Sequence, residues 1–236
     1  MKILSVDTSA NVATVAITED DKLICEFILN NKLTHSQTLM PIIDNVLKSA
    51  DINLSCIDLI AVANGPGSFT GLRIGVSAVK GLATALDKQV VGVSTLMAMA
   101  YNLPFCDGTI CPIMDARRDQ VYNALYKWED GELLQLEEPR ALGILELLED
   151  IDEKEKIIFL GDGVSVHKEI IKEKLGDRAV FAPPSANMQR ASALSVAAKK
   201  LFDEGKAMNS EELIPFYLRK SQEEREADER ESKITE

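Results

Sequence analysis

The stretch that decides the fold is Asn64-Gly65-Pro66-Gly67-Ser68-Phe69-Thr70-Gly71-Leu72-Arg73-Ile74-Gly75. It follows a continuously apolar run, 57–63, which predicts a central β-strand, and it opens a helix-like run, 71–86. A turn from strand to helix points backbone N–H groups and the positive end of the helix dipole at whatever lies above it. The turn is therefore either a cradle for phosphate or a tight turn that brings a helix close to another element.

The common phosphate-binding motifs are absent from this turn. A Walker loop has Lys followed by Ser or Thr after its last glycine, whereas Gly71 is followed by Leu72 and Arg73. The dinucleotide-binding fingerprint requires glycine where Thr70 stands. Motif logic thus favours the structural interpretation over phosphate binding, with Thr70 as the expected N-cap of the helix.

Composition and charge limit the classes of function. The chain has 236 residues, of which 46% are hydrophobic and 27% charged, as in soluble globular proteins. No apolar run approaches the roughly 20 residues of a membrane span and no signal-peptide pattern precedes the first strand, so we expect a cytoplasmic protein without a membrane partner. A net charge of −12 disfavours direct nucleic-acid binding. Scattered cysteines and two distant histidines predict no metal site.

A hairpin-led set of strands occurs twice along the chain. The first set is 3–6, 12–17 and 23–29, and the second is 110–114, 121–127 and 133–136. The repeat predicts two related lobes, 1–104 and 109–220, joined by a Pro- and Gly-containing linker and followed by a charged tail, 221–236. This pattern resembles the actin-like (ASKHA, ribonuclease-H-like) superfamily, so the expected class is α/β with mixed sheets flanked by helices.

Two helices of the first lobe carry apolar stripes. In helix 36–50 the apolar residues have helical spacing, and helix 71–86 has one large apolar face and one stripe of small residues. Packing on the chain's own sheet accounts for the large face, while the small stripe is the better candidate for an intermolecular seam. His35 either contacts a partner or is an ordinary surface histidine.

Two further loops stand where an actin-like protein would hold phosphate. Asp7-Thr8-Ser9 ends the first strand and either helps to place a nucleotide or only closes the turn. Arg117 and Arg118 either bind an anion or a partner's carboxylate, or pair locally with Asp115 or Asp119. The candidate site, a conformational loop or vestigial phosphate site, comprises Asp7, Thr8, Ser9, Gly65, Pro66, Gly67, Ser68, Thr70, Gly71, Arg73, Asp115, Arg117 and Arg118.

The string 65–75, with Asp7-Thr8-Ser9 and Asp115-Ala116-Arg117-Arg118, closely resembles the TsaB (YeaZ) family over residues 1 to about 225. The resemblance implies a protein required to place threonylcarbamoyl on N6 of adenosine 37 of tRNAs. The catalytic paralogue TsaD carries a metal-binding His-x-x-x-His, whereas Thr95 and Met99 stand at the equivalent positions here. The resemblance therefore implies a subunit without catalytic residues or a cofactor of its own. Such a subunit supports TsaD together with TsaE, and ATP and a metal bind to those partners.

The resemblance also implies the contact surface. In this family the two first-lobe helices meet the matching pair of TsaD, or form a homodimer when TsaD is missing, and tRNA is reached only through the complex. The expected partner-binding residues are His35, Leu39, Ile42, Ile43, Val46, Ile74, Ser77, Ala78, Gly81 and Ala85. The alternative is a small-molecule kinase or ATPase of the same fold that uses Asp7, the glycine-rich turn and Asp115.

Overall fold

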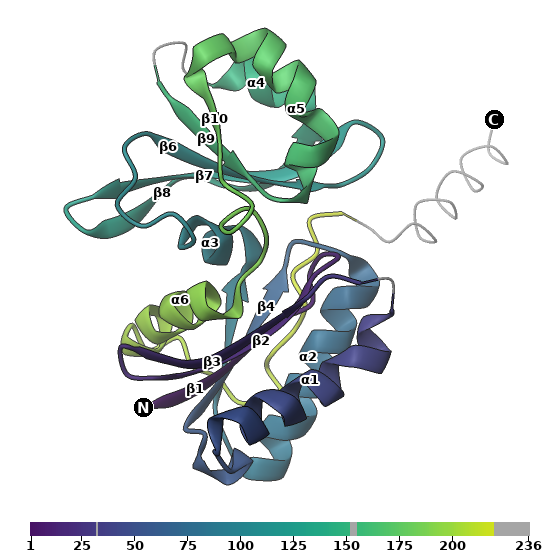
Figure 1. Cartoon of the computed structure of the whole chain (residues 1–236), viewed down its shortest axis with the longest axis vertical. Coiled ribbons are helices and arrows are strands. Elements are labelled where there is room, and N and C mark those ends of the chain that lie inside the picture. The colour runs from purple at the N-terminus through teal and green to yellow at the C-terminus, as the bar shows by residue number, and fades with distance from the viewer. Residues whose placement is uncertain (32, 152–154, 220–236) are drawn as a thin grey trace, which may run out of the picture.

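The structure, a computed structural model, describes residues 1–31, 33–151 and 155–219 (Figure 1). The charged tail expected at 221–236 lies outside the described residues. None of the helices in the described ranges is long and apolar enough to cross a membrane.

The first lobe is built on a five-stranded mixed sheet with the order β3-β2-β1-β4-β5. Its strands are β1 (Lys2–Asp7), β2 (Ala13–Glu19), β3 (Lys22–Leu29), β4 (Leu59–Gly65) and β5 (Val90–Ser94). The first three strands pair antiparallel, and β4 and β5 extend the sheet in parallel. Strand β4 is covered on both faces, which explains why its sequence is continuously apolar rather than alternating.

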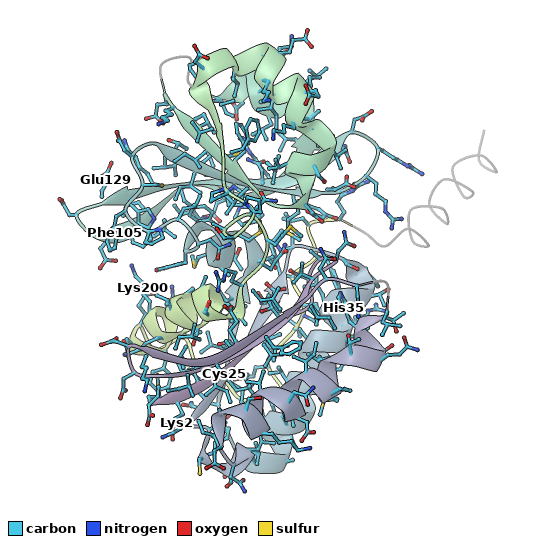
Figure 2. The ribbon with its side chains drawn as sticks, in the orientation of Figure 1. Lys2, Cys25, His35, Phe105, Glu129 and Lys200 are labelled. Atoms are coloured by element: carbon cyan, nitrogen blue, oxygen red, sulfur yellow. The ribbon has the colours of Figure 1, made fainter. Side chains whose placement is uncertain are left out.

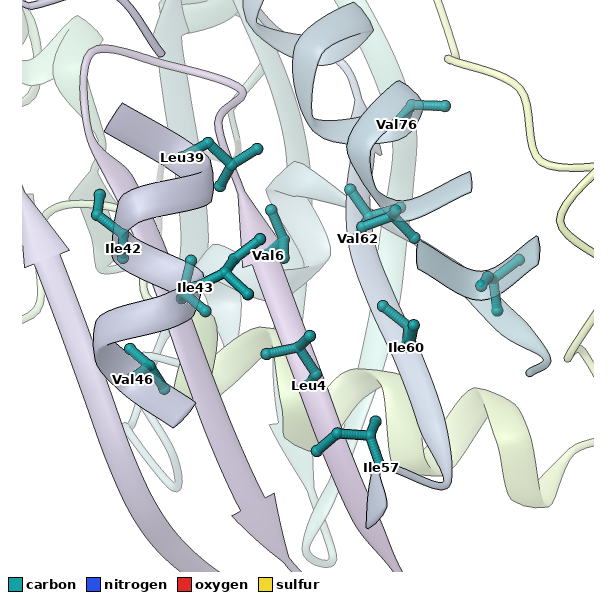
Figure 3. Close-up of a cluster of buried hydrophobic side chains, with 14 of the residues drawn as sticks. Leu4, Val6, Leu39, Ile42, Ile43, Val46, Ile57, Ile60, Val62 and Val76 are labelled. Atoms are coloured by element: carbon teal, nitrogen blue, oxygen red, sulfur yellow. The ribbon is translucent and has the colours of Figure 1, made fainter. Parts of the chain in front are cut away.

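Two helices, α1 (His35–Ala50) and α2 (Phe69–Leu86), cover one face of this sheet. The apolar side chains of α1 point inward onto β1 and β4 (Figure 3). Four of them are at most 3% exposed: Leu39, Ile42, Ile43 and Val46. The apolar stripe of α1 thus packs into the chain's own core, because an amphipathic helix is stabilised chiefly by burying its apolar face.

The second lobe repeats the same sheet, with the order β10-β9-β6-β7-β8. Its strands are β6 (Thr109–Asp115), β7 (Gln120–Glu129), β8 (Glu132–Gly143), β9 (Ile157–Leu160) and β10 (Ala179–Phe181). Helices α4 (Ile144–Asp150) and α5 (Asp162–Leu175) pack on one face of it. The matching strand orders confirm the two mixed sheets and the duplication that the sequence predicts. The short strand β10 carries too few residues to show a period of two.

Two helices, α3 (Thr95–Ala100) and α6 (Ala191–Asp203), lie between the sheets (Figure 1). Helix α6 packs its Leu194 and Ala197 against Ile3 and Leu59 of the first sheet. The chain then stays on the first lobe, where Leu213 joins the core under α2. The prediction that 109–220 forms the second lobe is therefore wrong for its last part, 191–219, because the second face of the first sheet needs an apolar cover.

The start of α6 is held by a glutamate from the edge strand β3. One carboxylate oxygen of Glu26 accepts hydrogen bonds from the Ser192 backbone nitrogen at 2.9 Å and the Ser192 hydroxyl at 2.7 Å. Its other oxygen pairs with Arg190, and the Glu26 side chain is only 6% exposed. Glu26 thus satisfies the first backbone N–H groups of α6 as an N-cap residue would, although it lies more than 160 positions before the helix in the chain.

We expect Glu26→Ala to lower the free energy of unfolding by about 2–3 kcal/mol. The substitution removes a buried carboxylate and leaves its three hydrogen-bond donors without an acceptor. Urea denaturation of the variant and the parent measures this. Glu19→Ala is the matched control, since the Glu19 side chain is 43% exposed in its pair with Lys2, and ion pairs near the surface contribute at most about 1 kcal/mol. Equal losses in both variants would show that Glu26 has no special role.

Candidate functional site

The glycine-rich turn joins β4 to α2, as its sequence predicts. The N-cap of α2 is Ser68, whose hydroxyl accepts from the Gly71 backbone nitrogen at 3.3 Å. The prediction of Thr70 as N-cap is wrong, because the helix begins at Phe69 and Thr70 already lies in its first turn. Serine caps a helix at least as well as threonine, and Ser68 stands two positions before Thr70.

The turn is pressed directly against the loop that follows β1. The Ser68 backbone nitrogen donates to the Ser9 carbonyl oxygen at 2.6 Å, and the Thr8 hydroxyl donates to the Gly71 carbonyl oxygen at 2.8 Å. A Cβ atom on Gly67 would overlap the Ser9 carbonyl oxygen, and one on Gly71 would overlap the Thr8 carbonyl oxygen. Glycine is therefore required at both positions, because any side chain would prevent this close contact between the two backbones.

On the side where a side chain would start, Gly67 and Gly71 are thus covered by the chain's own backbone. Gly65 is covered in the same way by the carbonyl of Phe216, and Pro66 is buried. The contacts of Gly65, Gly67 and Gly71 support the close-packing interpretation of this turn, and the phosphate-cradle interpretation stays a prediction.

Asp7 lies behind this loop rather than at a surface. Its side chain is 1% exposed, and one oxygen accepts from the Ser9 backbone nitrogen at 2.8 Å and from the Ser9 hydroxyl at 2.6 Å. The other oxygen has no hydrogen-bond partner among the described residues. Burial raises the pKa of Asp7 to about 6, against the lowering effect of the Ser9 hydrogen bonds and nearby His35. The carboxyl therefore holds the loop together from within.

A cleft of about 700 Å³ opens between the two lobes, in front of this loop. The first lobe contributes residues 9–11, His35 and 67–70 to its walls, and the second lobe contributes 114–118, Tyr122 and Asp162. Residues 216–219 close one side. The cleft is the place where Ser9, Gly67, Ser68, Thr70, Asp115, Arg117 and Arg118 come together, whereas Asp7, Thr8, Gly71 and Arg73 do not line it.

The loop from β6 to β7 is held in an unusual backbone conformation. Arg117, Arg118 and Asp119 have φ values of 62°, 55° and 56°, a left-handed region that costs a non-glycine residue roughly 1–2 kcal/mol. The Arg117 backbone nitrogen donates to an Asp115 carboxylate oxygen at 2.8 Å. Both arginine side chains are exposed, and in the described ranges neither forms an ion pair with Asp115 or Asp119. The local-pairing interpretation of these arginines is therefore wrong.

Asp162 stands at the start of α5 and faces the same loop. A carboxylate oxygen of Asp162 accepts from the Asp115 backbone nitrogen at 3.1 Å. Burial raises the pKa of Asp162, and the neighbouring Asp115 carboxylate raises it further. Asp162 thus serves the loop geometry.

The segment after α6, residues 209–219, which we name the C-terminal strap, completes the site. Lys80 of α2 donates to the carbonyl oxygens of Glu211 and Leu213 at 3.1 and 3.0 Å. The ring of Tyr217 stacks on Phe69 with centroids 4.4 Å apart. Finally, the Arg219 guanidinium donates to the Ala116 carbonyl oxygen at 2.7 Å. The strap is anchored on the first lobe and its last described residue reaches the second.

Arg73 and His35 have local partners. The Arg73 guanidinium lies 4.0 Å from the centroid of the Phe69 ring, and its Nε donates to the Tyr217 hydroxyl at 3.2 Å. His35 lies at the end of α1 that faces the second lobe (Figure 2), where its Nε2 donates to the Ala10 carbonyl oxygen at 2.7 Å. Both residues therefore support the walls of the cleft through these contacts.

The expected partner-binding residues divide into two groups. Leu39, Ile42, Ile43 and Val46 are buried in the chain's own core, so their assignment to a contact surface is wrong. Ile74 and Ala78 are half-buried against the same core. Ser77, Gly81 and Ala85 are exposed along α2, and a Cβ atom on Gly81 would meet no atom within 4 Å. The small stripe, and not the large face, is thus the exposed part of α2.

Several residues of the cleft escape sequence reasoning. Tyr122 and Asp162 come from elements whose own pattern serves the second core, and Phe216 and Arg219 come from a segment without periodicity. A cluster of aromatic residues next to an arginine, in an otherwise irregular stretch, is the one available signal for the strap. It does not reveal that the segment crosses back to the first lobe.

The repeated sheet and the cleft between the lobes define a protein of the actin-like fold class. The solved structure of YeaZ from Pseudomonas aeruginosa is similar, with a TM-score of 0.78 and 27% identity over 92% of this chain and 99% of that one. The ethanolamine utilization protein EutJ from Carboxydothermus hydrogenoformans shares the fold alone, with a TM-score of 0.54 and 11% identity, covering 84% of this chain and 90% of that one.

Sequence comparisons agree with the fold. The family model described as TsaD, tRNA N6-adenosine threonylcarbamoyltransferase, matches residues 22–227. The tRNA threonylcarbamoyladenosine biosynthesis protein TsaB of Bacillus subtilis is 37% identical over 93% of this chain and 94% of that protein. The TsaB of Escherichia coli is 31% identical over 93% and 95%. The chain belongs to the TsaB (YeaZ) family, which is related to TsaD, and thus to the pathway of tRNA threonylcarbamoyladenosine biosynthesis.

Proposed function

We propose that the chain is a non-catalytic scaffold subunit, which binds and supports TsaD together with TsaE in the threonylcarbamoylation of N6 of adenosine 37 in cytoplasmic tRNAs. The observation that carries this proposal is the exposed small-residue stripe on α2, formed by Ser77, Gly81 and Ala85. Small side chains let a second helix approach closely, so that backbone and side chains of both helices make many contacts. The same stripe serves for a homodimer when TsaD is missing.

Exposed apolar side chains on the neighbouring helix support this surface. Met40 of α1 is 49% exposed, and Leu33, just before the helix, is 58% exposed. Exposed apolar side chains on one helix and exposed small residues on its neighbour are typical of a helix-to-helix interface. The buried face of α1 then holds the helix on the sheet, while its outer face is free for the partner.

The residues at the positions of the catalytic metal ligands support a non-catalytic role. Thr95 and Met99, which stand where TsaD has histidines, are both buried with 0% exposure. Met99 packs in the core between α3 and the second sheet. Neither side chain has the chemistry or the access that a catalytic metal requires.

The geometry of the site gives little support to the alternative function, a kinase or an ATPase. Asp7 is enclosed behind Ser9, and the glycines of the turn are explained by their close contacts with the chain's own backbone. A carboxylate that places a metal-bound nucleotide must reach the ligand, directly or through one water. We therefore do not propose that this chain transfers phosphate.

We expect Gly81→Leu and Ser77→Arg each to abolish binding of the TsaD of the same organism and leave the fold intact. Both positions are exposed, so the larger side chains block the partner and not the core. Ala78→Arg is a poorer choice because Ala78 is half-buried. Size-exclusion chromatography with light scattering, on the chain alone and mixed with TsaD, measures complex formation.

Val196→Arg is the matched control, since Val196 is 55% exposed on α6, away from the stripe. It is expected to bind TsaD as the parent does. A folded Gly81→Leu variant that still forms the normal complex would place the interface elsewhere.

A further inference from the structure

The connection between α3 and β6, residues 101–108, exposes a phenylalanine ring. Phe105 is 76% exposed, more than any other large apolar side chain in the described ranges. Its φ is 57°, in the left-handed region that an aromatic residue rarely adopts. Folding normally buries such a ring, and residues held in rare backbone regions cluster at functional sites. An exposed ring on an unfavourable backbone is therefore a candidate anchor for another molecule.

Phe105 is the most exposed member of an aromatic cluster. Its ring centroid lies 5.3 Å from that of Trp128, and Tyr101 meets Trp128 edge-on at 5.5 Å. Leu133 pairs with Trp128 across the β7–β8 hairpin. Tyr101, Trp128 and Leu133 are half-buried and support the exposed ring from below. We name these four residues the aromatic patch, and Figure 2 shows Phe105 and Glu129 at the same end of the second lobe.

The aromatic patch is accompanied by carboxylates. The two segments that form it, 101–108 and 128–134, contain no lysine or arginine and four acidic residues: Asp107, Glu129, Asp130 and Glu132. Lys127 lies 3.6 Å from Glu129. Lys200 of α6 pairs with Glu132. The other two carboxylates form no ion pair within the part of the chain that the structure describes, so the patch keeps an excess of negative charge.

This charge determines which kind of molecule fits the patch. A second copy of the chain would bring the same carboxylates against it, and nucleic acids and anionic lipid head groups would be repelled. An arginine side chain, in contrast, stacks on aromatic rings and pairs with carboxylates through its planar set of N–H donors. We propose that the aromatic patch and its carboxylates bind a segment of a partner protein that presents arginine next to aliphatic side chains.

The aromatic patch is separate from the small-residue stripe proposed for TsaD. The stripe lies on α2 of the first lobe, whereas the patch lies on the connection 101–108 and on the β7–β8 hairpin of the second lobe. The chain can thus hold one protein on each lobe. Phe105→Asn is expected to leave the complex with TsaD unchanged in light scattering, so the two proposals fail separately. Loss of TsaD binding in this variant would make the patch part of that interface and overturn the present proposal.

Isothermal titration calorimetry on the full chain tests the proposal with two acetylated hexapeptides, one of alternating arginine and leucine and one of alternating glutamate and leucine. We expect the arginine peptide to bind with a dissociation constant of about 1 mM or below, and the glutamate peptide at least about tenfold more weakly. Trp128 is the one tryptophan of the chain, so its fluorescence locates the bound peptide. We expect its emission to shift with the same dissociation constant. Binding without such a shift would place the peptide elsewhere and overturn the proposal.

Two variants test the residues of the patch. Phe105→Asn is expected to weaken binding of the arginine peptide at least about tenfold, because the ring is lost, while asparagine tolerates the left-handed backbone. Glu129→Gln/Asp130→Asn is expected to weaken it by a similar factor, because the guanidinium groups lose their acceptors. Both sites are exposed, and circular dichroism checks the fold. If Phe105→Asn does not fold, the double variant decides.

The matched controls remove the same groups from other surfaces. Phe27→Thr removes a ring that is 40% exposed on the edge strand β3, and Glu169→Gln/Glu173→Gln removes two exposed carboxylates from α5. Each is expected to change affinity less than about threefold. No binding of the arginine peptide at about 5 mM would overturn the proposal, as would binding that a folded patch variant keeps in full or an equal loss in the controls. A dimer of the chain alone that Phe105→Asn disrupts would assign the patch to a second copy and also overturn it.

Discussion

Replacing Gly71 by alanine will destabilise the protein by about 3 kcal/mol or more, whereas Gly81→Ala in the same helix will stabilise it by about 1 kcal/mol. At Gly71 the new Cβ atom would overlap the Thr8 carbonyl oxygen, a backbone atom that cannot move without shifting β1. At Gly81 it would meet nothing within 4 Å, so only the better helix propensity of alanine remains. The same change from glycine to alanine thus lowers the free energy of unfolding at one position of α2 and raises it at another.

Urea denaturation followed by circular dichroism measures both free energies of unfolding under one set of conditions. The Gly81→Ala variant is the matched control, since it makes the same chemical change without the overlap. If the two variants lose equal stability, the contact between the glycine-rich turn and the Thr8 loop is not what requires glycine. If Gly71→Ala is neutral, the loop after β1 is free to move and the close-packing interpretation is wrong.

The second large effect concerns Asp7, whose replacement by asparagine will stabilise the protein by about 2–3 kcal/mol at pH 8. Asparagine keeps the oxygen that accepts from Ser9 and carries no charge to bury. The folded pKa of Asp7 is raised from 3.8 to about 6, which corresponds to about 3 kcal/mol at 1.36 kcal/mol per pKa unit. The Asp7 carboxyl therefore lowers the free energy of unfolding at pH values at which it is ionised.

The pH dependence follows from the direction of this shift. Because the folded state binds the proton more tightly than the unfolded state, the stabilising effect of the proton is complete below pH 3.8 and is lost as the pH rises through about 6. The advantage of Asp7→Asn over the parent should therefore shrink by about 1 kcal/mol from pH 8 to pH 5.5.

Urea denaturation at several pH values between 5.5 and 8 measures this difference. Asp21→Asn removes an exposed carboxylate and is expected to give the same pH profile as the parent. A constant difference between Asp7→Asn and the parent over this range would show that the Asp7 carboxyl does not titrate there. A destabilised variant at pH 8 would show that the unpartnered oxygen has a partner that asparagine cannot satisfy.

Local patterns were enough to predict much of the fold. The unbroken apolar run at 57–63 identified β4, because a strand covered on both faces has no polar face. The run 12–17 identified β2, and this strand is also buried on both faces, since α1 and α6 pack against it. The repeat of the hairpin set identified two lobes with the same strand order. Ser94 directly precedes α3 and caps it, since its hydroxyl accepts from the Met97 backbone nitrogen.

The site was predicted only in part, since its residues meet through contacts that no local pattern encodes. Arg117 and Arg118 were recognised from their own loop, but Arg219 reaches them from a strap about 100 positions away. The four inward residues of α1 had the same spacing that an interface would have. Periodicity tells that a helix face is buried, and it does not tell which molecule buries it.

The sequence by itself determined the class of fold, the family and the turn between β4 and α2, because these depend on local spacing and on a specific string of residues. Only the tertiary structure decided that the glycines touch the Thr8 loop, that α6 and the strap return to the first lobe, and that three arginines share one cleft. The physical reason is that such contacts join residues far apart in the chain, and they form when apolar faces find their cover in three dimensions.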